Sequence, residues 1–347
     1  MDDARIAPAP RPELVSEAQR RFFGVNGYLV LERFFSPECI ARLKTRIDSF
    51  WTERKPECPL TVDCFEDYPN GSGIRRRLFR EVSAHSRAWP YKLNDTHLVD
   101  EVITEFAVDR RLMGMLTELL GGVPVVCNTL VFERSSQQPA HFDTFFMPSK
   151  TPNKMCATWI AMDPVTDDNG PLFYYPGSHR IEPYRFSDGT VKANDREYPL
   201  AEAHIAKIIE THDLKKEVFY AQPGDVFIWH AQLLHGGSVI RDMAQTRTSL
   251  VTHYWTTIDY PSAEQHIVLG EGRLLLRKGH QQVLADAEQA AIVKFAAGLE
   301  TPPDLVEAAP PEFDPNGYLL KNPDVFRAGE NPYVHYLNHG RREGRSW

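Results

Sequence analysis

Apolar residues follow two different periods along this chain. Helical spacing holds over residues 98–120, "LVDEVITEFAVDRRLMGMLTELL", and stops at Gly121. Nearer the N-terminus, Ser16 can cap a short helix, and the run "YLVLERFF" favours a strand. Ser36, followed directly by proline, then opens a second helix, since proline is favoured in a first turn. These segments predict a helix, a strand and a second helix near the N-terminus, and a further helical segment at 98–120.

From residue 123 to about 259 the pattern changes to short β-branched and aromatic runs separated by turn residues. Examples are "VPVVCNTLVFER", "KMCATWIAMD", "GPLFYYPGSH", "EVFYAQPGDVFIWH" and "RTSLVTHYWTTI". Many short strands with glycine and proline between them indicate a sandwich or barrel rather than alternating strands and helices. We therefore expect a mainly β fold with flanking helices. Residues 56–98 look irregular, and residues 280–300 look helical.

Four segments follow from these patterns. We expect a flexible tail at 1–13, one large domain at 14–300, a proline-rich linker at 301–311 and a small C-terminal helical module at 312–347.

Composition bounds the class of protein. The chain is 42% hydrophobic and 25% charged, which suits a soluble globular protein, and its net charge of −8 argues against a general nucleic-acid binder. No run approaches the ~20 apolar residues of a membrane span, and the polar start "MDDARIAPAPRPELVSE" does not match a signal peptide. Five cysteines without zinc-knuckle spacing favour free thiols in a reducing compartment. We expect a cytoplasmic protein.

The stretch "HFDTFFMPSK" carries the first candidate chemistry. In a strand, His141 and Asp143 project to one face while Phe142 points to the other. A buried imidazole and carboxylate are costly unless something satisfies both. A divalent metal would do so, and so would an ordinary hydrogen bond.

The stretch "PGDVFIWHAQLLHGGSVIRDMAQTRTSLVTHYW" adds further ligand types. It offers His230, His235 and His253 in strand-like surroundings, with Arg247 twelve residues after His235. Two histidines and one carboxylate on one face of an octahedron suit iron(II) and leave three positions open. An arginine on a neighbouring strand can hold a carboxylate through two parallel hydrogen bonds.

Together these segments resemble a known family. The ordered set "HFD", "DNGPLFYYPGSH", "PGDVFIWHAQLLHGGS" and "RTSLVTHYW" is similar to the phytanoyl-CoA dioxygenase family of iron(II)/2-oxoglutarate oxygenases, over residues 16 to about 260. The resemblance implies a double-stranded β-helix core, a jelly roll of the cupin-like kind. It also implies Fe(II) as cofactor, with 2-oxoglutarate and O2 as co-substrates.

The resemblance assigns roles to particular residues. It implies that His141, Asp143 and His235 ligate iron, with His235 preferred over His230 because it begins the "HGGS" segment. It places Arg247 against the distal carboxylate of 2-oxoglutarate.

Four further positions match the family less closely. Ser238 fits a hydroxyl residue before the arginine, displaced by one extra glycine, and Trp159 matches an aromatic beside the co-substrate. Lys92 and Asn128 are weaker candidates for contact with 2-oxoglutarate. The alternative is a core role for Trp159 and a structural or solvent-facing role for Lys92 and Asn128. The resemblance favours a structural role for His253, and likewise for His179 in the "PGSH" turn.

Because Asp143 keeps the carboxylate that halogenating relatives lack, the resemblance favours hydroxylation with release of succinate and CO2. The substrate is expected to be a small molecule, free or carrier-linked, selected by segments 56–98 and 181–215. "GIRRRLFRE" can either bind an anionic substrate or form a solvated basic face. Two alternatives remain: a jelly-roll protein that binds a metal or ligand without turnover, and a metal-dependent cupin enzyme that does not use 2-oxoglutarate.

The C-terminal module resembles a short unit appended to bacterial glycosyltransferases and other proteins, on the pattern "YL…NPDV…NP…HYL.HG..EGR". His335 and His339, at helical spacing, suggest zinc, but no cysteine or third ligand lies nearby. A small aromatic core of Tyr318, Tyr333 and Tyr336 is the favoured interpretation. A role in protein interaction is a hypothesis.

Overall fold

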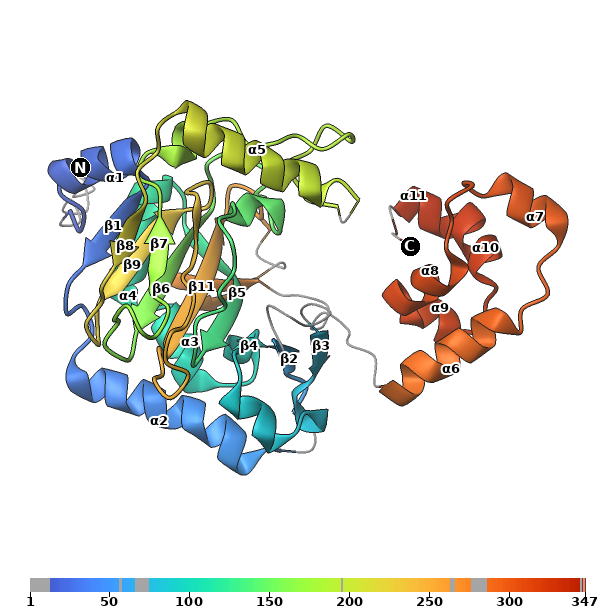
Figure 1. The fold of residues 1–347 in the computed structure, drawn as a ribbon, viewed down its shortest axis with the longest axis horizontal. Helices are drawn as coiled ribbons and strands as arrows, with labels where there is room; N and C mark the ends of the chain where they lie inside the picture. The colour runs from blue at the N-terminus through green and yellow to red at the C-terminus, as the bar shows by residue number, and fades with distance from the viewer. Residues whose placement is uncertain are drawn as a thin grey trace, which may run out of the picture. The chain divides into compact units, whose positions relative to one another are not determined.

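The computed structural model describes residues 13–55, 58–65, 75–194, 196–262, 266–275, 286–343, 345 and 347 (Figure 1). The chain divides into two units, residues 1–280 and 281–347, and each is described by itself.

Two mainly antiparallel sheets form the first unit, which confirms the jelly-roll prediction. The large sheet has the order β1-β9-β6-β11-β5-β4-β2-β3, and the hairpin β12–β13 joins it where β13 runs parallel to β5. The small sheet has the order β10-β7-β8. The large-sheet strands are β1 (Tyr28–Leu31), β2 (Thr61–Cys64), β3 (Arg75–Leu78), β4 (Tyr91–Asn94), β5 (Pro124–Phe132), β6 (Cys156–Ala161), β9 (Val226–His230), β11 (Ser249–Thr256), β12 (His266–Leu269) and β13 (Gly272–Leu275). The small-sheet strands are β7 (Leu172–Tyr174), β8 (Glu217–Phe219) and β10 (His235–Gly237).

Side chains on β11 show how the layers separate. Leu250 and Tyr254 point into a core shared with the helices, whereas Val251 points into a second core between the two sheets. Alternation along a strand explains this division, because successive side chains face opposite sides of the sheet. Odd-numbered residues of β11 therefore face the interior of the barrel.

Helices cover both outer faces. α2 (Pro37–Glu53), α3 (Glu101–Ala107) and α4 (Arg110–Leu120) pack on the large sheet, and α5 (Tyr198–Thr211) packs on the small sheet (Figure 1). The first helix, α1 (Glu17–Asn26), begins at Ser16, whose hydroxyl accepts from a backbone N–H as predicted. Short 3-10 turns occupy Phe79–Glu81, Ala84–Ala88, Thr96–Leu98, Asp143–Phe145 and Ser178–Arg180.

Two local predictions were wrong. Residues 56–98 are not simply irregular, because β2, β3 and β4 extend the large sheet there; each strand has four residues, too short for a clear alternation signal. Residues 98–120 form two helices rather than one. The break comes where Asp109 accepts hydrogen bonds from the first N–H groups of α4 and so starts a new helix.

The second unit is a set of short helices with its own apolar core. Its helices are α6 (Asp286–Ala297), α7 (Pro303–Ala308), α8 (Pro315–Lys321), α9 (Pro323–Arg327), α10 (Pro332–His335) and α11 (Arg341–Glu343), with a π-helical turn at Tyr336–Gly340. The core contains Tyr318 and Tyr336, with Tyr333 packed against it, as predicted. The hydroxyl of Tyr318 lies 2.7 Å from Nδ1 of His335, which accounts for that histidine without a metal.

The division of the chain differs from the predicted one in two places. We assigned the helix of residues 280–300 to the large domain, but Ile292 of α6 is buried in the core of the second unit. Residues 301–311 contain α7 rather than an extended linker. Pro302 and Pro303 sit at the start of this helix, where a missing N–H costs nothing, and Pro310 and Pro311 follow its end. Among the described residues, no helix combines the length and apolar character needed to cross a bilayer.

Candidate metal centre and co-substrate site

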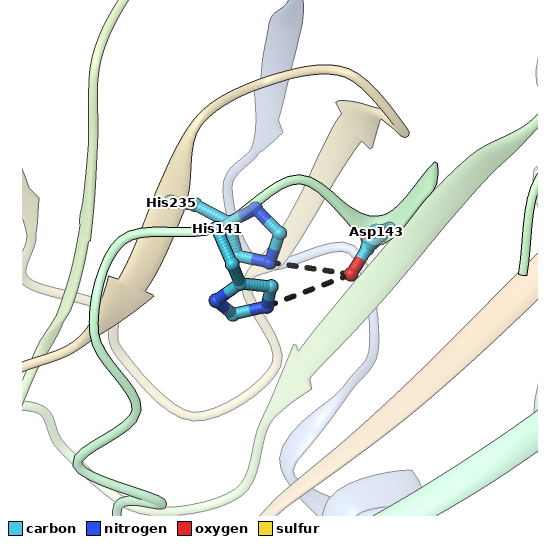
Figure 2. Close-up of side chains that lie close together, drawn as sticks. All are labelled: His141, Asp143 and His235. Carbon is cyan, nitrogen blue, oxygen red and sulfur yellow. Dashed lines mark ion pairs between the residues drawn. The ribbon is translucent and has the colours of Figure 1, made fainter. Parts of the chain in front are cut away.

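His141, Asp143 and His235 converge in the interior of the first unit (Figure 2). Nε2 of each histidine lies 3.7 Å from Oδ1 of Asp143, and the two imidazole rings are 4.5 Å apart. His141 is not on a strand as predicted; it forms an isolated antiparallel bridge with His235 at the start of β10. Asp143 then begins a 3-10 turn. Phe142 is fully buried in a separate apolar cluster, so it does point away from the ligand pair.

Glycine allows the close approach between these two segments. A Cβ on Gly236 would lie 2.6 Å from the carbonyl oxygen of Gln138, so only glycine fits between β10 and the loop that carries His141. The "HGG" sequence thus brings the two histidines together.

Backbone carbonyls select the ring nitrogens that face the centre. Nδ1 of His141 lies 2.8 Å from the carbonyl oxygen of Pro139, and Nδ1 of His235 lies 2.8 Å from that of Leu233. A carbonyl only accepts, so each Nδ1 carries the proton and each Nε2 presents a lone pair toward Asp143. This tautomer is the one a metal ligand needs.

Burial keeps the centre in the ligating protonation state. The three residues are between 5% and 7% exposed. Burial, with the neighbouring His235, lowers the pKa of His141 to about 3, so its ring is neutral at pH 7. Burial alone would raise the pKa of Asp143, but the facing His235 and His253 hold it below its usual range. A neutral imidazole at His141 and an ionised carboxylate at Asp143 result.

The donor set fits Fe(II). Ligand atoms about 2.1 Å from one ion and at right angles lie roughly 3 Å apart, so the 3.7 Å separations need only a small contraction. Nitrogen and oxygen donors on three adjacent positions match the facial triad of non-haem iron and leave three positions open.

Arg247 presents an unpaired cation inside the barrel. It is 4% exposed, and neither its Nε nor its Nη1 has a hydrogen-bond partner among the described residues. Its guanidinium lies 5.5 Å from the ring centre of Trp159, which lines the core between the sheets. Burial lowers the pKa of Arg247 to about 10, which still leaves it charged at pH 7. Such a group calls for an anion, and the carboxylate of a bound ligand would satisfy it.

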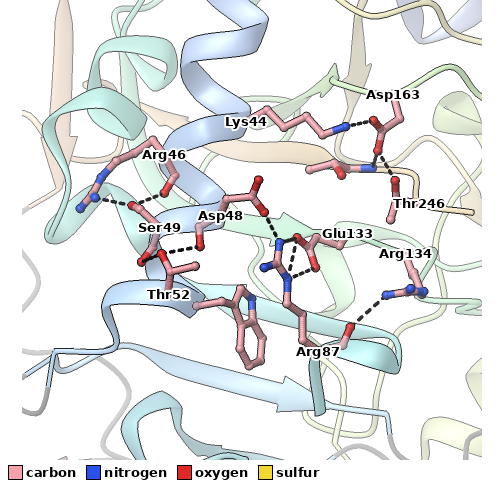
Figure 3. A network of polar contacts seen from close by, with 12 residues as sticks. Lys44, Arg46, Asp48, Ser49, Thr52, Arg87, Glu133, Arg134, Asp163 and Thr246 are labelled. Atoms are coloured by element: carbon pink, nitrogen blue, oxygen red, sulfur yellow. Dashed lines mark hydrogen bonds and ion pairs between the residues drawn. The ribbon is translucent and has the colours of Figure 1, made fainter. Parts of the chain in front are cut away.

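Polar contacts hold the backbone on both sides of Arg247 (Figure 3). Oδ2 of Asp163 accepts from Thr246 Oγ1 and from Thr248 N–H, each at 2.8 Å, while its other oxygen pairs with Lys44 of α2. The N–H of Arg247 donates to the carbonyl oxygen of Glu133 at 2.7 Å. The large sheet and α2 thus fix the point from which the guanidinium extends.

A buried hydroxyl lies on the same face of β11. Ser249 is two residues after Arg247, fully buried, and its Oγ has no hydrogen-bond partner among the described residues. Ser238, the predicted hydroxyl, follows β10 and is half-buried; the described contacts involve only its backbone. The sequence pattern did not single out Ser249.

Lys92 and Asn128 are both engaged with other side chains. Nζ of Lys92 lies 3.0 Å from Oδ2 of Asp63, the buried carboxylate that Arg76 also binds with two hydrogen bonds. Lys92 is close enough to the centre that its charge contributes to the low pKa of His141. Asn128 instead contacts His253, with 2.7 Å between its Oδ1 and the ring Nδ1.

Two residues at the centre were missed by sequence reasoning. Trp229 Nε1 donates to Oδ2 of Asp143 at 2.7 Å, and Nε2 of His253 lies 3.4 Å from the same oxygen. The sequence signal for His253 was only its residue type, because histidine commonly pairs with a carboxylate. Nothing in the sequence shows that β11 lies beside the turn that carries Asp143. His230 lies near Phe23 and His179 instead, apart from the cluster that contains His235.

Comparison with known proteins decides the family. The family model described as phytanoyl-CoA dioxygenase (PhyH) matches residues 23–242, well over half of the chain. The chain belongs to this family. Membership, together with the triad, makes it an Fe(II)- and 2-oxoglutarate-dependent dioxygenase. The phytanoyl-CoA dioxygenase family therefore supplies the enzyme class that the geometry alone left open.

Curated relatives are distant but extensive. A probable phytanoyl-CoA dioxygenase of Caenorhabditis elegans is 23% identical over 256 residues, covering 70% of this chain and 75% of that protein. The peroxisomal phytanoyl-CoA dioxygenase of Rattus norvegicus is 24% identical over 257 residues, covering 70% and 68%.

Solved structures share the fold. EctD from S. alaskensis with bound Fe is 18% identical with a TM-score of 0.52, covering 76% of this chain and 82% of that one. The non-heme alpha ketoglutarate dependent carbocyclase SnoK from nogalamycin biosynthesis is 14% identical with a TM-score of 0.51, covering 70% and 85%.

Proposed function

We propose that this dioxygenase hydroxylates a C–H bond of a small molecule at an iron held by His141, Asp143 and His235. The convergence of those three buried side chains, all with ligand atoms within 4.8 Å of one another, carries the proposal. The chemistry that iron and 2-oxoglutarate supply when bound is reduction of O2 coupled to decarboxylation, giving succinate, CO2 and one oxygen atom for the substrate.

The residues of this chain bind, orient and shield. Arg247 would hold the distal carboxylate of 2-oxoglutarate, with the indole of Trp159 as the apolar wall beside it. Lys92 would add positive charge near the dianionic co-substrate while Asp63 keeps it in place. Ser238 remains a candidate hydroxyl from the family pattern, and Ser249 is added as a buried alternative at the start of β11, two residues after Arg247.

The substrate is proposed to be a small molecule, free or carrier-linked. The two curated relatives described above are named as phytanoyl-CoA dioxygenases, which supports including acyl thioesters among the candidates. Arg76 of the "GIRRRLFRE" run is paired with buried Asp63. This ion pair favours a structural role for Arg76 over capture of an anionic substrate.

Succinate release with Fe(II), O2 and 2-oxoglutarate tests the proposal, screened against acyl thioesters, amino acids and sugar-linked acids. We expect one substrate class to raise the rate well above the uncoupled background. Asp143→Ala should abolish that release, whereas Arg241→Met, at an exposed arginine, should not change it. Substrate-stimulated succinate release that persists in Asp143→Ala would refute the assigned centre.

A further inference from the structure

The two oxygens of Asp143 face different partners. Oδ1 faces the two ligand histidines, whereas Oδ2 accepts from Trp229 Nε1 at 2.7 Å and lies 3.4 Å from Nε2 of His253. Asn128 contacts the other ring nitrogen of His253, with 2.7 Å between Oδ1 and Nδ1. A line of polar contacts therefore runs from β5 through β11 to the metal-binding turn.

Every member of this line is buried and comes from the rigid sheet. Asn128, Trp229 and His253 are 8%, 2% and 4% exposed. In the register of the large sheet His253 stands opposite Asn128 on β5 and opposite Ala157 on β6, which in turn pairs with Trp229 on β9. The small side chain of Ala157 leaves space between the imidazole and the indole. Two strands, β9 and β11, therefore place a ring nitrogen beside one carboxylate oxygen, and β5 supports the second of these rings.

The chemistry of these groups limits what they can do. An indole N–H donates only, and an ionised carboxylate accepts only, so Trp229 must donate to Asp143. The amide of Asn128 has Oδ1 beside Nδ1 of His253, and a 180° turn of the amide places its NH2 there instead. The NH2 can then donate to Nδ1, which leaves the ring proton on Nε2, facing Oδ2. A purely apolar core position at residue 253 would need no such partner.

We propose that His253 is a positioning residue for Asp143 and that Asn128 orients His253. Together with Trp229, His253 occupies Oδ2 and so confines Asp143 to binding the metal through Oδ1 alone. This rests on the proposed role of the triad as metal ligands. A carboxylate that bound through both oxygens would take a second coordination position. Tying up Oδ2 keeps three positions open for co-substrate and oxygen.

Other buried histidines of this unit show the contrast. His230 is 6% exposed, yet its Nδ1 accepts from the backbone N–H of Gln232 and its ring lies near His179. His97 is 4% exposed and contacts Thr129. Neither contacts a proposed ligand, and His230 therefore serves as the matched control.

The test compares four full-length variants: His253→Phe, His253→Gln, Asn128→Leu and His230→Gln. Co(II) would replace Fe(II), so that affinity can be measured by competition with a chelator and coordination number by visible absorption, without turnover. We expect His253→Phe to weaken Co(II) binding about 10–100-fold and to change the visible spectrum. His253→Gln should recover most of both, since its amide can donate to Oδ2. Asn128→Leu should lie between them.

Two results would overturn the proposal. One is His253→Phe folding normally with wild-type affinity and spectrum. The other is His253→Gln failing as badly as His253→Phe, with both variants losing stability without metal, which would show a packing role. His230→Gln should retain wild-type binding throughout. A separate variant, His141→Ala, should lose Co(II) binding entirely, and wild-type binding by it would refute the proposed metal centre itself rather than the role of His253.

Discussion

Replacing Arg247 by methionine should make the protein more stable without co-substrate and unable to gain stability from it. Burial moves the pKa of Arg247 from 12.5 to about 10. At about 1.4 kcal/mol per pKa unit, that shift corresponds to about 3 kcal/mol of unfavourable free energy for the charged form at pH 7. Methionine fills a similar volume without that charge, so the free energy of unfolding should rise by about 1–3 kcal/mol.

Binding of 2-oxoglutarate should stabilise the wild type more than Arg247→Met. A ligand that binds only the folded state at 100 times its Kd adds about 2.7 kcal/mol, and wild-type protein should gain about that much from 2-oxoglutarate in the presence of Mn(II). Arg247→Met should gain almost nothing, because its partner for the distal carboxylate is gone. Urea unfolding with and without 2-oxoglutarate measures both quantities.

The control is Arg241→Met, which removes an exposed arginine from the preceding loop and should leave both values unchanged. If Arg247→Met lowers the stability of the co-substrate-free protein, the guanidinium already has a stabilising partner. If Arg247→Met keeps the gain from 2-oxoglutarate, the distal carboxylate binds elsewhere. Either result refutes the reasoning.

Three further outcomes are expected. Fe(II) titration under anaerobic conditions should show one site in the wild type and none in Asp143→Ala; retained affinity would contradict the assignment. Without metal, the free energy of unfolding should fall as pH drops from 6.5 toward 4, because burial lowers the pKa of His141 to about 3 and that of His230 to about 4 while the unfolded histidines still take up protons. Each histidine lowers the free energy of unfolding by at most about 1.4 kcal/mol per pH unit. Urea unfolding at pH 7 and pH 5 measures the difference, and His141→Gln should remove the part that His141 contributes. Residues 1–280 alone should bind Fe(II) like the whole chain, because the proposed ligands and their supporting strands all lie in that unit; loss of binding in a folded truncation would count against it.

The sequence was sufficient for the fold class and for naming three candidate metal ligands that lie together in the structure. Cap residues such as Ser16 and Ser36 act locally, and their helices begin where the pattern predicts. The order of His141, Asp143 and His235 within a family pattern identified residues that the fold does bring together.

What the sequence did not reveal depends on which strands are neighbours. His253 looked structural because its role comes from the turn at Asp143, 110 positions earlier in the chain and adjacent only once β11 pairs with β5 and β6. Ser249 was overlooked for the same reason, since a buried hydroxyl without a partner is visible only in three dimensions. Strands as short as β2 and β4 cannot be predicted from the alternation of apolar and polar residues, because four residues give too few alternations.

The separate apolar cores of the two units imply that heat should not melt this chain in one cooperative step. A calorimetric trace of the whole protein should be the sum of two transitions, so a single midpoint would describe neither unit. Tryptophan emission offers a natural filter, because five of the six tryptophans precede residue 281 and only Trp347 follows it. Fluorescence would thus follow the melting of the oxygenase unit almost alone.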